Sequence, residues 1–486
     1  MRTLKNFSII GSGTALAQGI TAIALPALTR FYSPEAFTDW AIFVSISAIF
    51  SGVATMRFEL AMVLPKDRKT AAAIGLGSIG IALVASVFAG FILWIGGPWI
   101  LEGNTEGSFG LLALLLSLGI LSAAIYQIAL AWYTREATFK WYALAQFALP
   151  TMIIFGQILS AALGQRTGIG LIIGLVGGQT LCACALILNL WKQFKSELLC
   201  ENKAQFICHT LFAYRQYPFY MTPYTLVGVL RDRLVYLLLG RYGGTGATGF
   251  YGVAARLVNI PNSFISSTLR PILFQQAAGA PHSSLENPIL ITCRGLGIVS
   301  VLFLTPCVAQ ATWFAQLVLG ERWGNAGPYI AALSIPMIWL LMGNWLDRMF
   351  DVLGRQRLAL TLEVIFSILA MTGLIGGYLV FQDLLVAVWI QSGLLTIYYL
   401  AWLGTLFHIA GFKLSRLLVV ILEILAVGSV VLTIDLGLTV FLLPAGAFVV
   451  AVLLSSLVAS LYGYKAWLPI IKGILNSRRV IQPSEH

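Results

Sequence analysis

The stretch PKDRKTAAAIGLGSIGIALVASVFAGFILWIGG, residues 65–97, carries four charged side chains in its first five positions and none in the remaining 28. A helix rises about 1.5 Å per residue, so about 20 apolar residues cross a hydrocarbon core about 30 Å thick. The run after Lys69 therefore predicts a transmembrane helix. Its basic beginning is typical of the cytoplasmic end of such a helix.

Comparable apolar runs recur along the 486 residues, of which 59% are hydrophobic and only 10% are charged. Soluble domains average about 25% charged residues, so this composition excludes an ordinary soluble enzyme. A transmembrane β-barrel would show segments of about ten residues with alternating polarity, and no such pattern dominates. We therefore predict an all-α polytopic membrane protein.

The apolar runs predict fourteen membrane-spanning helices with short connections. They cover residues 6–31, 37–64, 71–97, 109–133, 139–163, 168–191, 217–240, 246–274, 290–319, 327–353, 358–381, 384–408, 415–437 and 440–468. The longest polar stretch lies in the middle of the chain and marks a boundary. The predicted parts are a six-helix N-terminal lobe (1–194), a cytoplasmic connecting loop (195–216), a six-helix C-terminal lobe (217–409), and two extra helices with a basic cytoplasmic tail (410–486).

The distribution of basic residues tests this count, because cytoplasmic loops are enriched in Lys and Arg. With a cytoplasmic N-terminus, 22 of the 30 Lys and Arg residues fall at cytoplasmic ends and loops, and four fall outside. The outer loops carry acidic residues instead, namely Glu35, Asp39, Glu102, Glu106, Glu321, Asp383 and Asp435. This alternation predicts that both termini are cytoplasmic. It also explains the net charge of +11 without nucleic-acid binding.

No catalytic or metal-binding pattern stands out in the sequence. The six Cys and four His residues lack the spacing of metal ligands, and no Ser/His/Asp arrangement is found. Cysteines buried in apolar helices are the simpler explanation for the thiols. We expect no metal, no cofactor and no enzymatic activity.

Charged residues inside the predicted spans are the main functional candidates, because each costs about 2.5–3.5 kcal/mol to insert. Arg231 and Arg256 lie on consecutive spans, each ten residues from the outer end and so about 15 Å deep. With Arg233 and Asp232 they leave an excess charge of +2. Guanidinium groups bind phosphate in bidentate geometry and stay charged when buried, so this group suits a phosphorylated substrate. An internal Arg–Asp network that holds helices together is the alternative.

A second charged group lies about 10 Å from the cytoplasmic side. Its acidic members are Glu59, Asp347, Glu363 and Glu423. We assign gating or ion coupling to Arg57, Glu59, Asp232, Asp347, Arg348 and Glu363. Ion pairs at the membrane interface, without a role in transport, are the alternative. Arg57 and Glu59 are two residues apart, so on a continuous helix they point to opposite faces and cannot pair.

Several motifs resemble bacterial polysaccharide flippases of the multidrug/oligosaccharidyl-lipid/polysaccharide exporter superfamily. They are LTRFYSPEAF (28–37), RFELAMVLPKD (57–67), RQYPFYMTP (215–223), RDRLVYLLLG (231–240) and GFYGVAARLVNIP (249–261). The resemblance implies two six-helix lobes plus two C-terminal helices, with basic residues around a central cavity. The arginines of the matching motifs are Arg30, Arg57, Arg231, Arg233 and Arg256. We assign four of them to pyrophosphate binding: Arg231, Arg256, Arg233 and Arg30.

The resemblance also implies a function. Alternating access would carry a polyprenyl-pyrophosphate-linked oligosaccharide across the bacterial plasma (inner) membrane for O-antigen or exopolysaccharide synthesis. The expected partners are an undecaprenyl-pyrophosphate-linked glycan, membrane lipid, a polysaccharide polymerase, a chain-length regulator, and a coupled proton or cation. Two alternatives stay open: a cation-coupled drug or small-solute exporter of the same superfamily, and a membrane-embedded glycan polymerase or ligase. The short outer loops disfavour the last of these.

Overall fold

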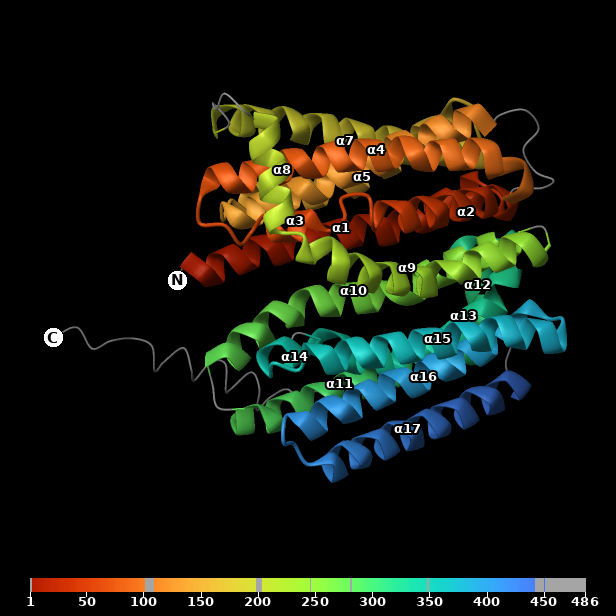
Figure 1. Ribbon diagram of the computed structural model, residues 1–486. Helices are drawn as coiled ribbons and strands as arrows, with labels where there is room; N and C mark the ends of the chain where they lie inside the picture. Colours follow the sequence, from red (N-terminus) through yellow and green to blue (C-terminus); the bar gives the residue numbers. More distant parts are fainter. Residues whose placement is uncertain are drawn as a thin grey trace. The chain divides into compact units, whose positions relative to one another are not determined.

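The computed structural model describes residues 2–100, 109–197, 203–244, 246–279, 282–347, 349–441 and 450. Within these ranges the chain forms helices and turns and no strand (Figure 1). Nine of the described helical segments are long and apolar enough to cross a membrane. The chain is thus an all-α polytopic membrane protein, as predicted. The count of fourteen spans stays a prediction, because nearly all of the span expected at 440–468 lies outside the described residues.

The chain divides into two compact units. Unit 1 comprises Met1–Val253 and Glu363–Leu384, and unit 2 comprises Ala254–Leu362 and Leu385–His486. Each unit therefore contains segments that are distant in sequence. The lobe boundaries expected from the polar stretch in the middle of the chain stay a prediction.

Unit 1 is built mainly from the first nine described helices. They are α1 (Arg2–Phe31), α2 (Pro34–Ser51), α3 (Phe58–Ala61), α4 (Arg68–Ile100), α5 (Phe109–Arg135), α6 (Phe139–Ala162), α7 (Gly168–Glu197), α8 (Lys203–Ala213) and α9 (Gln216–Tyr242). The first part of α10 (Ala247–Gly279) and most of α15 (Gln356–Phe381) complete the unit. Helix α6 packs on α1 and α7, α5 packs on α4 and α7, and α2 packs on α9. Helix α8 forms within the stretch expected to be a connecting loop, and it packs on α4 (Figure 1).

Glycines allow the backbones of α6 and α7 to approach closely. A Cβ atom added to Gly174 would lie 2.5 Å from the backbone nitrogen of Gln157, and one added to Gly178 would lie 2.6 Å from the Cα atom of Ile153. Both distances are far too short for a real side chain. Lipid tails are as apolar as leucine, so helices in a membrane associate largely through such close van der Waals contact.

Unit 2 contains the rest of α10 and α15 together with the later helices. These are α11 (His282–Ala309), α12 (Ala311–Leu319), the 3-10 helix η1 (Glu321–Ala326), α13 (Gly327–Gly343), the 3-10 helix η2 (Asn344–Leu346), α14 (Met349–Val352), α16 (Leu384–Ile409) and α17 (Leu414–Phe441). Helix α11 packs on α13 and α17. A buried apolar cluster joins these helices to α16 through residues such as Met342, Phe407 and Ile424.

Three predicted spans are interrupted in the structure. The span expected at 37–64 becomes α2 and α3 with a turn between them, the span at 290–319 divides at Gln310, and the span at 327–353 divides into α13, η2 and α14. Hydrophobic residues lie on both sides of each interruption, so an apolar run alone gives no signal of it. Asp435, expected in an outer loop, lies inside α17 and is fully buried.

Candidate functional site

The interruption between α2 and α3 creates the first charged site of unit 1. Helix α2 ends at Ser51, and the chain then turns through Met56 and Arg57, whose φ angles are 49° and 59°. These left-handed conformations are uncommon for residues with a Cβ atom, and they cluster where a fold holds a functional conformation in place. The turn changes the direction of the chain before α3 begins at Phe58.

This turn brings together two charges that a continuous helix would separate. The Nη1 atom of Arg57 lies 3.0 Å from Oε1 of Glu59, and the Thr55 hydroxyl donates a hydrogen bond of 2.5 Å to Oε2 of Glu59. The Glu59 residue is only 3% exposed. The prediction that Arg57 and Glu59 cannot pair was wrong, because it assumed a regular helix across residues 37–64. The buried Nε of Arg57 has no hydrogen-bond partner among the described residues.

Arg231 of α9 forms the second charged site of the same unit. Its Nε donates to Oδ1 of Asp232 at 2.9 Å, and its Nη1 lies 2.5 Å from Oε1 of Glu363 and 3.4 Å from the hydroxyl of Ser367. The Arg231 side chain is 14% exposed and that of Glu363 is 18% exposed, so their contact is largely shielded from solvent, whereas Asp232 is 61% exposed. The ion pair with Asp232 agrees with the sequence analysis, whereas the contact with Glu363 was not expected.

Glu363 changes the charge balance that the sequence suggested. Sequence reasoning grouped this residue with Asp347 near the cytoplasmic side, but α15 places its carboxylate on Arg231. Within unit 1, Arg231, Arg233, Asp232 and Glu363 now sum to zero. Of the other arginines predicted to bind pyrophosphate, Arg30 belongs to unit 1 and Arg256 to unit 2.

The two charged sites of unit 1 flank the same part of α9. A Cβ atom added to Gly52, at the end of α2, would lie 3.3 Å from Cγ2 of Val229. One added to Gly228 would lie 3.8 Å from Oε1 of Glu363. The stretch of α9 just before Arg231 thus contacts the α2–α3 turn and the carboxylate of α15. We call the Thr55–Arg57–Glu59 group and the Arg231–Asp232–Glu363 group the α9-flanking sites.

The other predicted site residues are placed separately. Arg233 lies with its guanidinium carbon 5.7 Å from the ring centroid of Tyr236. Arg30 is exposed in the last turn of α1, and Arg256 is half-buried in α10. Asp347 follows η2, and Arg348 lies outside the described residues. Ion pairs between predicted site residues join Arg57 to Glu59 and Arg231 to both Asp232 and Glu363.

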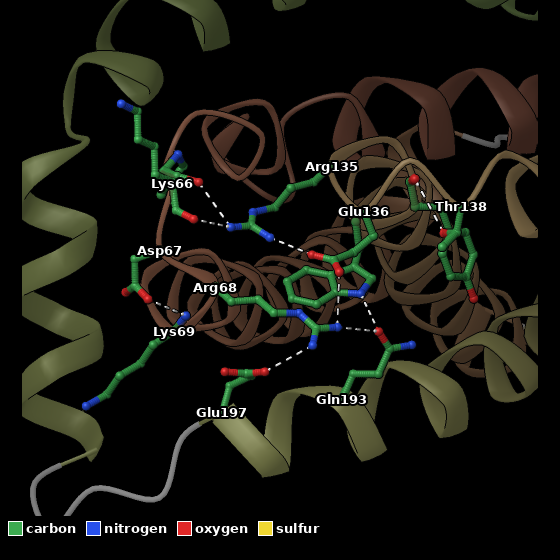
Figure 2. Close-up of polar contacts among 12 residues, drawn as sticks. Lys66, Asp67, Arg68, Lys69, Arg135, Glu136, Thr138, Gln193 and Glu197 are labelled. Atoms are coloured by element: carbon green, nitrogen blue, oxygen red, sulfur yellow. Dashed lines mark hydrogen bonds and ion pairs between the residues drawn. The ribbon is translucent and has the colours of Figure 1, made fainter. Parts of the chain in front are cut away.

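A polar network at one end of unit 1 was missed by the sequence analysis. Figure 2 shows Arg68 at the start of α4, Arg135 and Glu136 at the end of α5, and Glu197 at the end of α7. Arg68 lies 3.1 Å from Glu136 and 3.2 Å from Glu197, while Arg135 donates to the backbone carbonyl oxygens of Pro65 and Lys66. Both guanidinium groups also lie over the ring of Trp132, at 5.5 and 5.6 Å. Sequence reasoning treated these arginines only as topology signals.

Asp67 caps the beginning of α4 beside this network. The Thr70 hydroxyl and the Thr70 amide donate to the carboxylate at 2.7 and 2.9 Å. The Lys69 amide donates to it at 3.2 Å (Figure 2). These hydrogen bonds, with the hydroxyl of Thr70 as the largest cause, lower the pKa of Asp67. The carboxylate therefore stays charged and favours the positive N-terminal end of the helix dipole.

Comparison with known proteins adds family information to this geometry. The profile of a family described as "Polysaccharide biosynthesis protein" matches residues 27–328. The teichuronic acid biosynthesis protein TuaB of Bacillus subtilis (strain 168) is 26% identical over 194 residues, which are 39% of this chain. The match spans 37% of TuaB, little more than a third of that relative.

Solved structures of membrane transporters share the fold. The lipid II flippase MurJ, in an inward closed conformation, aligns with a TM-score of 0.72 at 15% identity, covering 94% of this chain and 99% of MurJ. An inward-facing multidrug resistance transporter of the MATE family, from the MOP superfamily, aligns with a TM-score of 0.57 at 13% identity, covering 86% and 96% of the two chains. At these identities the similarity establishes the fold of the chain.

Proposed function

The chain belongs to the family of polysaccharide biosynthesis proteins, and from this premise we propose that it is a flippase. Its cargo would be an oligosaccharide linked to a polyprenyl pyrophosphate, carried across the bacterial plasma membrane by alternating access for O-antigen or exopolysaccharide synthesis. The shared fold with a lipid II flippase supports this proposal. A polysaccharide polymerase and a chain-length regulator are the partners proposed for the later steps.

The observation that carries the proposal is Arg231 held between two carboxylates in a largely buried place. A guanidinium group offers five N–H donors in a planar fork, which matches the oxygens of a pyrophosphate. Asp232 and Glu363 satisfy that fork in the conformation described. An arriving pyrophosphate would replace one carboxylate and take over its hydrogen bonds. Binding and release then become an exchange of anions, in which no unpaired charge is left buried.

Glu363 would make this exchange reversible. Once the pyrophosphate has left, Arg231 needs another anion, and the carboxylate 2.5 Å away provides it. Arg256, Arg233 and Arg30 are proposed to contribute further positive charge to the same substrate. The pair of Arg57 and the buried Glu59 is proposed to act in gating together with Asp347 and Arg348.

The experiment that tests the proposal replaces Arg231 in a strain that lacks the native gene. Arg231→Ala should abolish surface polysaccharide and cause the lipid-linked glycan to accumulate inside the cell. Arg231→Lys keeps the charge but loses the bidentate fork, so it should retain partial activity, lower by about 10–100-fold, as expected for the loss of about 1.5–3 kcal/mol. Surface polysaccharide and extracted lipid-linked glycan are the measurements.

Arg166→Ala provides the matched control, because Arg166 is exposed in the turn between α6 and α7. It should leave export unchanged at the same level of membrane-inserted protein. Near-normal surface polysaccharide in Arg231→Ala, Arg256→Ala and the double variant would contradict the assigned site.

A cation-coupled exporter of drugs or small solutes is the second candidate. The buried Glu59 in unit 1 favours it, since an embedded carboxylate is a suitable group for coupling to an ion, and the fold shared with a multidrug transporter is consistent with it. A deletion strain should then become more sensitive to drugs. Unchanged resistance together with lost surface polysaccharide would reject this candidate in favour of the flippase.

A further inference from the structure

Helix α17 of unit 2 buries a carboxyl group against the interruption between α11 and α12. Gln310 occupies that interruption, with φ and ψ of −118° and 33°. Its backbone N–H donates a hydrogen bond to the carbonyl oxygen of Pro306. The turn points the Gln310 side chain at α17, where Nε2 donates to Oδ1 of Asp435 at 2.8 Å. Gln310 is 6% exposed and Asp435 is not exposed at all.

Within the part of the chain that the structure describes, the segments next to the α11–α12 interruption offer no positive charge near Asp435 to balance an ionised carboxylate. Residues 295–320, which form the facing parts of α11 and α12, contain no Asp, Glu, Lys, Arg or His, and the same holds for α13. The nearest charged groups along this chain segment are Arg294 and the Glu321–Arg322 pair of η1. The one ionisable group in between is the thiol of Cys307, which lies within electrostatic range of Asp435.

Two buried oxygen atoms at this contact lack a hydrogen-bond donor in the described part of the chain. Oδ2 of Asp435 and Oε1 of Gln310 are both buried, and neither has a hydrogen-bond partner among the described residues. Two adjacent acceptors without a donor are costly, and an ionised carboxylate next to them is costlier still. A protonated carboxyl removes the charge and provides the missing donor.

The same two helices contain a contrasting acid. Glu423 of α17 receives two hydrogen bonds from Arg294 of α11, at 2.6 and 2.5 Å. It lies twelve residues before Asp435, about 18 Å away along the helix. Glu423 is therefore part of a charged pair with Arg294, whereas Asp435 contacts the neutral amide of Gln310. This difference favours a protonated carboxyl group at Asp435.

We propose that Asp435 and Gln310 form a proton-binding site in unit 2, at the interruption between α11 and α12. The carboxyl group is protonated in the conformation described, with its Oδ1 accepting from the Gln310 amide. When α17 moves away from the interruption and water enters, the O–H bond breaks, the proton passes to water and a carboxylate remains. The site thus links proton uptake to the packing of α17. We further propose that this link drives export, which rests on the proposed function.

Infrared difference spectroscopy of the full chain in lipid nanodiscs tests the site without any substrate. The spectrum of the native chain minus that of Asp435→Asn should contain, at neutral pH, the C=O stretch of a protonated carboxyl. Glu423→Gln, the matched control, should instead remove carboxylate bands and leave the acid band in place. Gln310→Lys should convert the acid band into carboxylate bands, because it supplies the missing positive charge.

Other outcomes of the spectroscopy would overturn the proposal. Carboxylate bands in place of the acid band in the Asp435→Asn difference would show that the buried group is ionised. A response of the acid region to added sodium at constant pH would show a site for a metal cation rather than for a proton.

A separate measurement concerns the link to export. Asp435→Asn should flatten the pH dependence of lipid-linked glycan transport into vesicles, whereas Glu423→Gln should keep it. If the acid band is present but no transport of lipid-linked glycan occurs with the native chain, the flippase proposal fails and the proton site stands. If transport occurs and its pH dependence is the same in Asp435→Asn, the link between this site and export fails.

Discussion

Ionisable side chains inside this membrane protein are each held by polar partners. Glu59 is kept by a guanidinium and a hydroxyl, Arg231 by two carboxylates, and Asp435 by one amide. An uncompensated buried charge costs several kcal/mol, so each partner matters more for stability than an exposed ion pair would. Two of the three arrangements are proposed to exchange a ligand: an anion at Arg231 and a proton at Asp435.

The Arg57–Glu59 pair gives a prediction at this scale. Arg57→Met should lower the free energy of unfolding by about 3–5 kcal/mol, because it leaves the buried Glu59 carboxylate unpaired, and Glu59→Met should lower it by less, because the Arg57 side chain is 24% exposed. The double variant should lose clearly less than the sum of the two. Thermal unfolding in one detergent, analysed as a double-mutant cycle, is the measurement.

The exposed pair of Arg416 and Glu286, 3.4 Å apart, serves as the control for this cycle. Its single replacements should cost less than about 1 kcal/mol. Additive losses at Arg57 and Glu59 would show that the two residues do not act as a pair.

At the scale of secondary-structure elements, the interruptions decide where functional groups can meet. The turn after α2 brings Glu59 to Arg57, and the turn between α11 and α12 brings Gln310 to Asp435. A continuous helix would send residues two apart, such as Arg57 and Glu59, to opposite faces. Broken helices in membranes are tolerated where protein covers their free backbone groups.

The left-handed turn after α2 gives a second prediction. Met56→Gly should raise the free energy of unfolding by up to about 1 kcal/mol, because glycine adopts a φ of 49° without a Cβ clash. The same replacement at Met221, in helix α9, should lower it by about 1 kcal/mol. The two methionines are similarly exposed, at 46% and 42%, so the comparison isolates the backbone. Equal losses in both variants would mean that residue 56 is helical.

At the scale of the whole molecule, the family, the fold and the charge distribution agree. The chain has the fold of the lipid II flippase MurJ, and unit 1 gathers Lys66, Arg68 and Arg135 at one end (Figure 2). That end is predicted to face the cytoplasm, since basic residues are enriched there. Helix α6 begins next to it and runs for 24 residues, about 36 Å, so the turn at Gln165 marks the opposite end of the unit.

This orientation gives a third prediction. In a chain whose six native cysteines are replaced by alanine, Gln165→Cys should react with a membrane-impermeant maleimide on intact cells. Lys66→Cys should react only after the membrane is opened. Both positions are exposed, so access to the side chain is not limiting. Labelling of Lys66→Cys in intact cells would contradict the predicted topology.

Part of the candidate site could be identified from the sequence. Arg231, Asp232, Arg57, Glu59 and Glu363 were all singled out, because a charge inside an apolar run is conspicuous. Their partners were not, since Glu363 is 132 residues from Arg231 and contacts of that kind depend on packing. Asp435 was misplaced in an outer loop, because it lies close to the end of an apolar run and its burial comes from α11 and α12.

The sequence by itself determined that this is a polytopic helical membrane protein and which charges interrupt its spans. Apolar length and the bias of basic residues are local properties of the chain, and the bilayer acts on each span directly. Only the tertiary structure decided that α2 and α11 are interrupted, that Arg57 meets Glu59, that Glu363 neutralises Arg231, and that Asp435 meets only an amide. The physical reason is that a buried charge is balanced by whatever packs against it, and in this chain those partners lie on other helices or across a turn in the backbone.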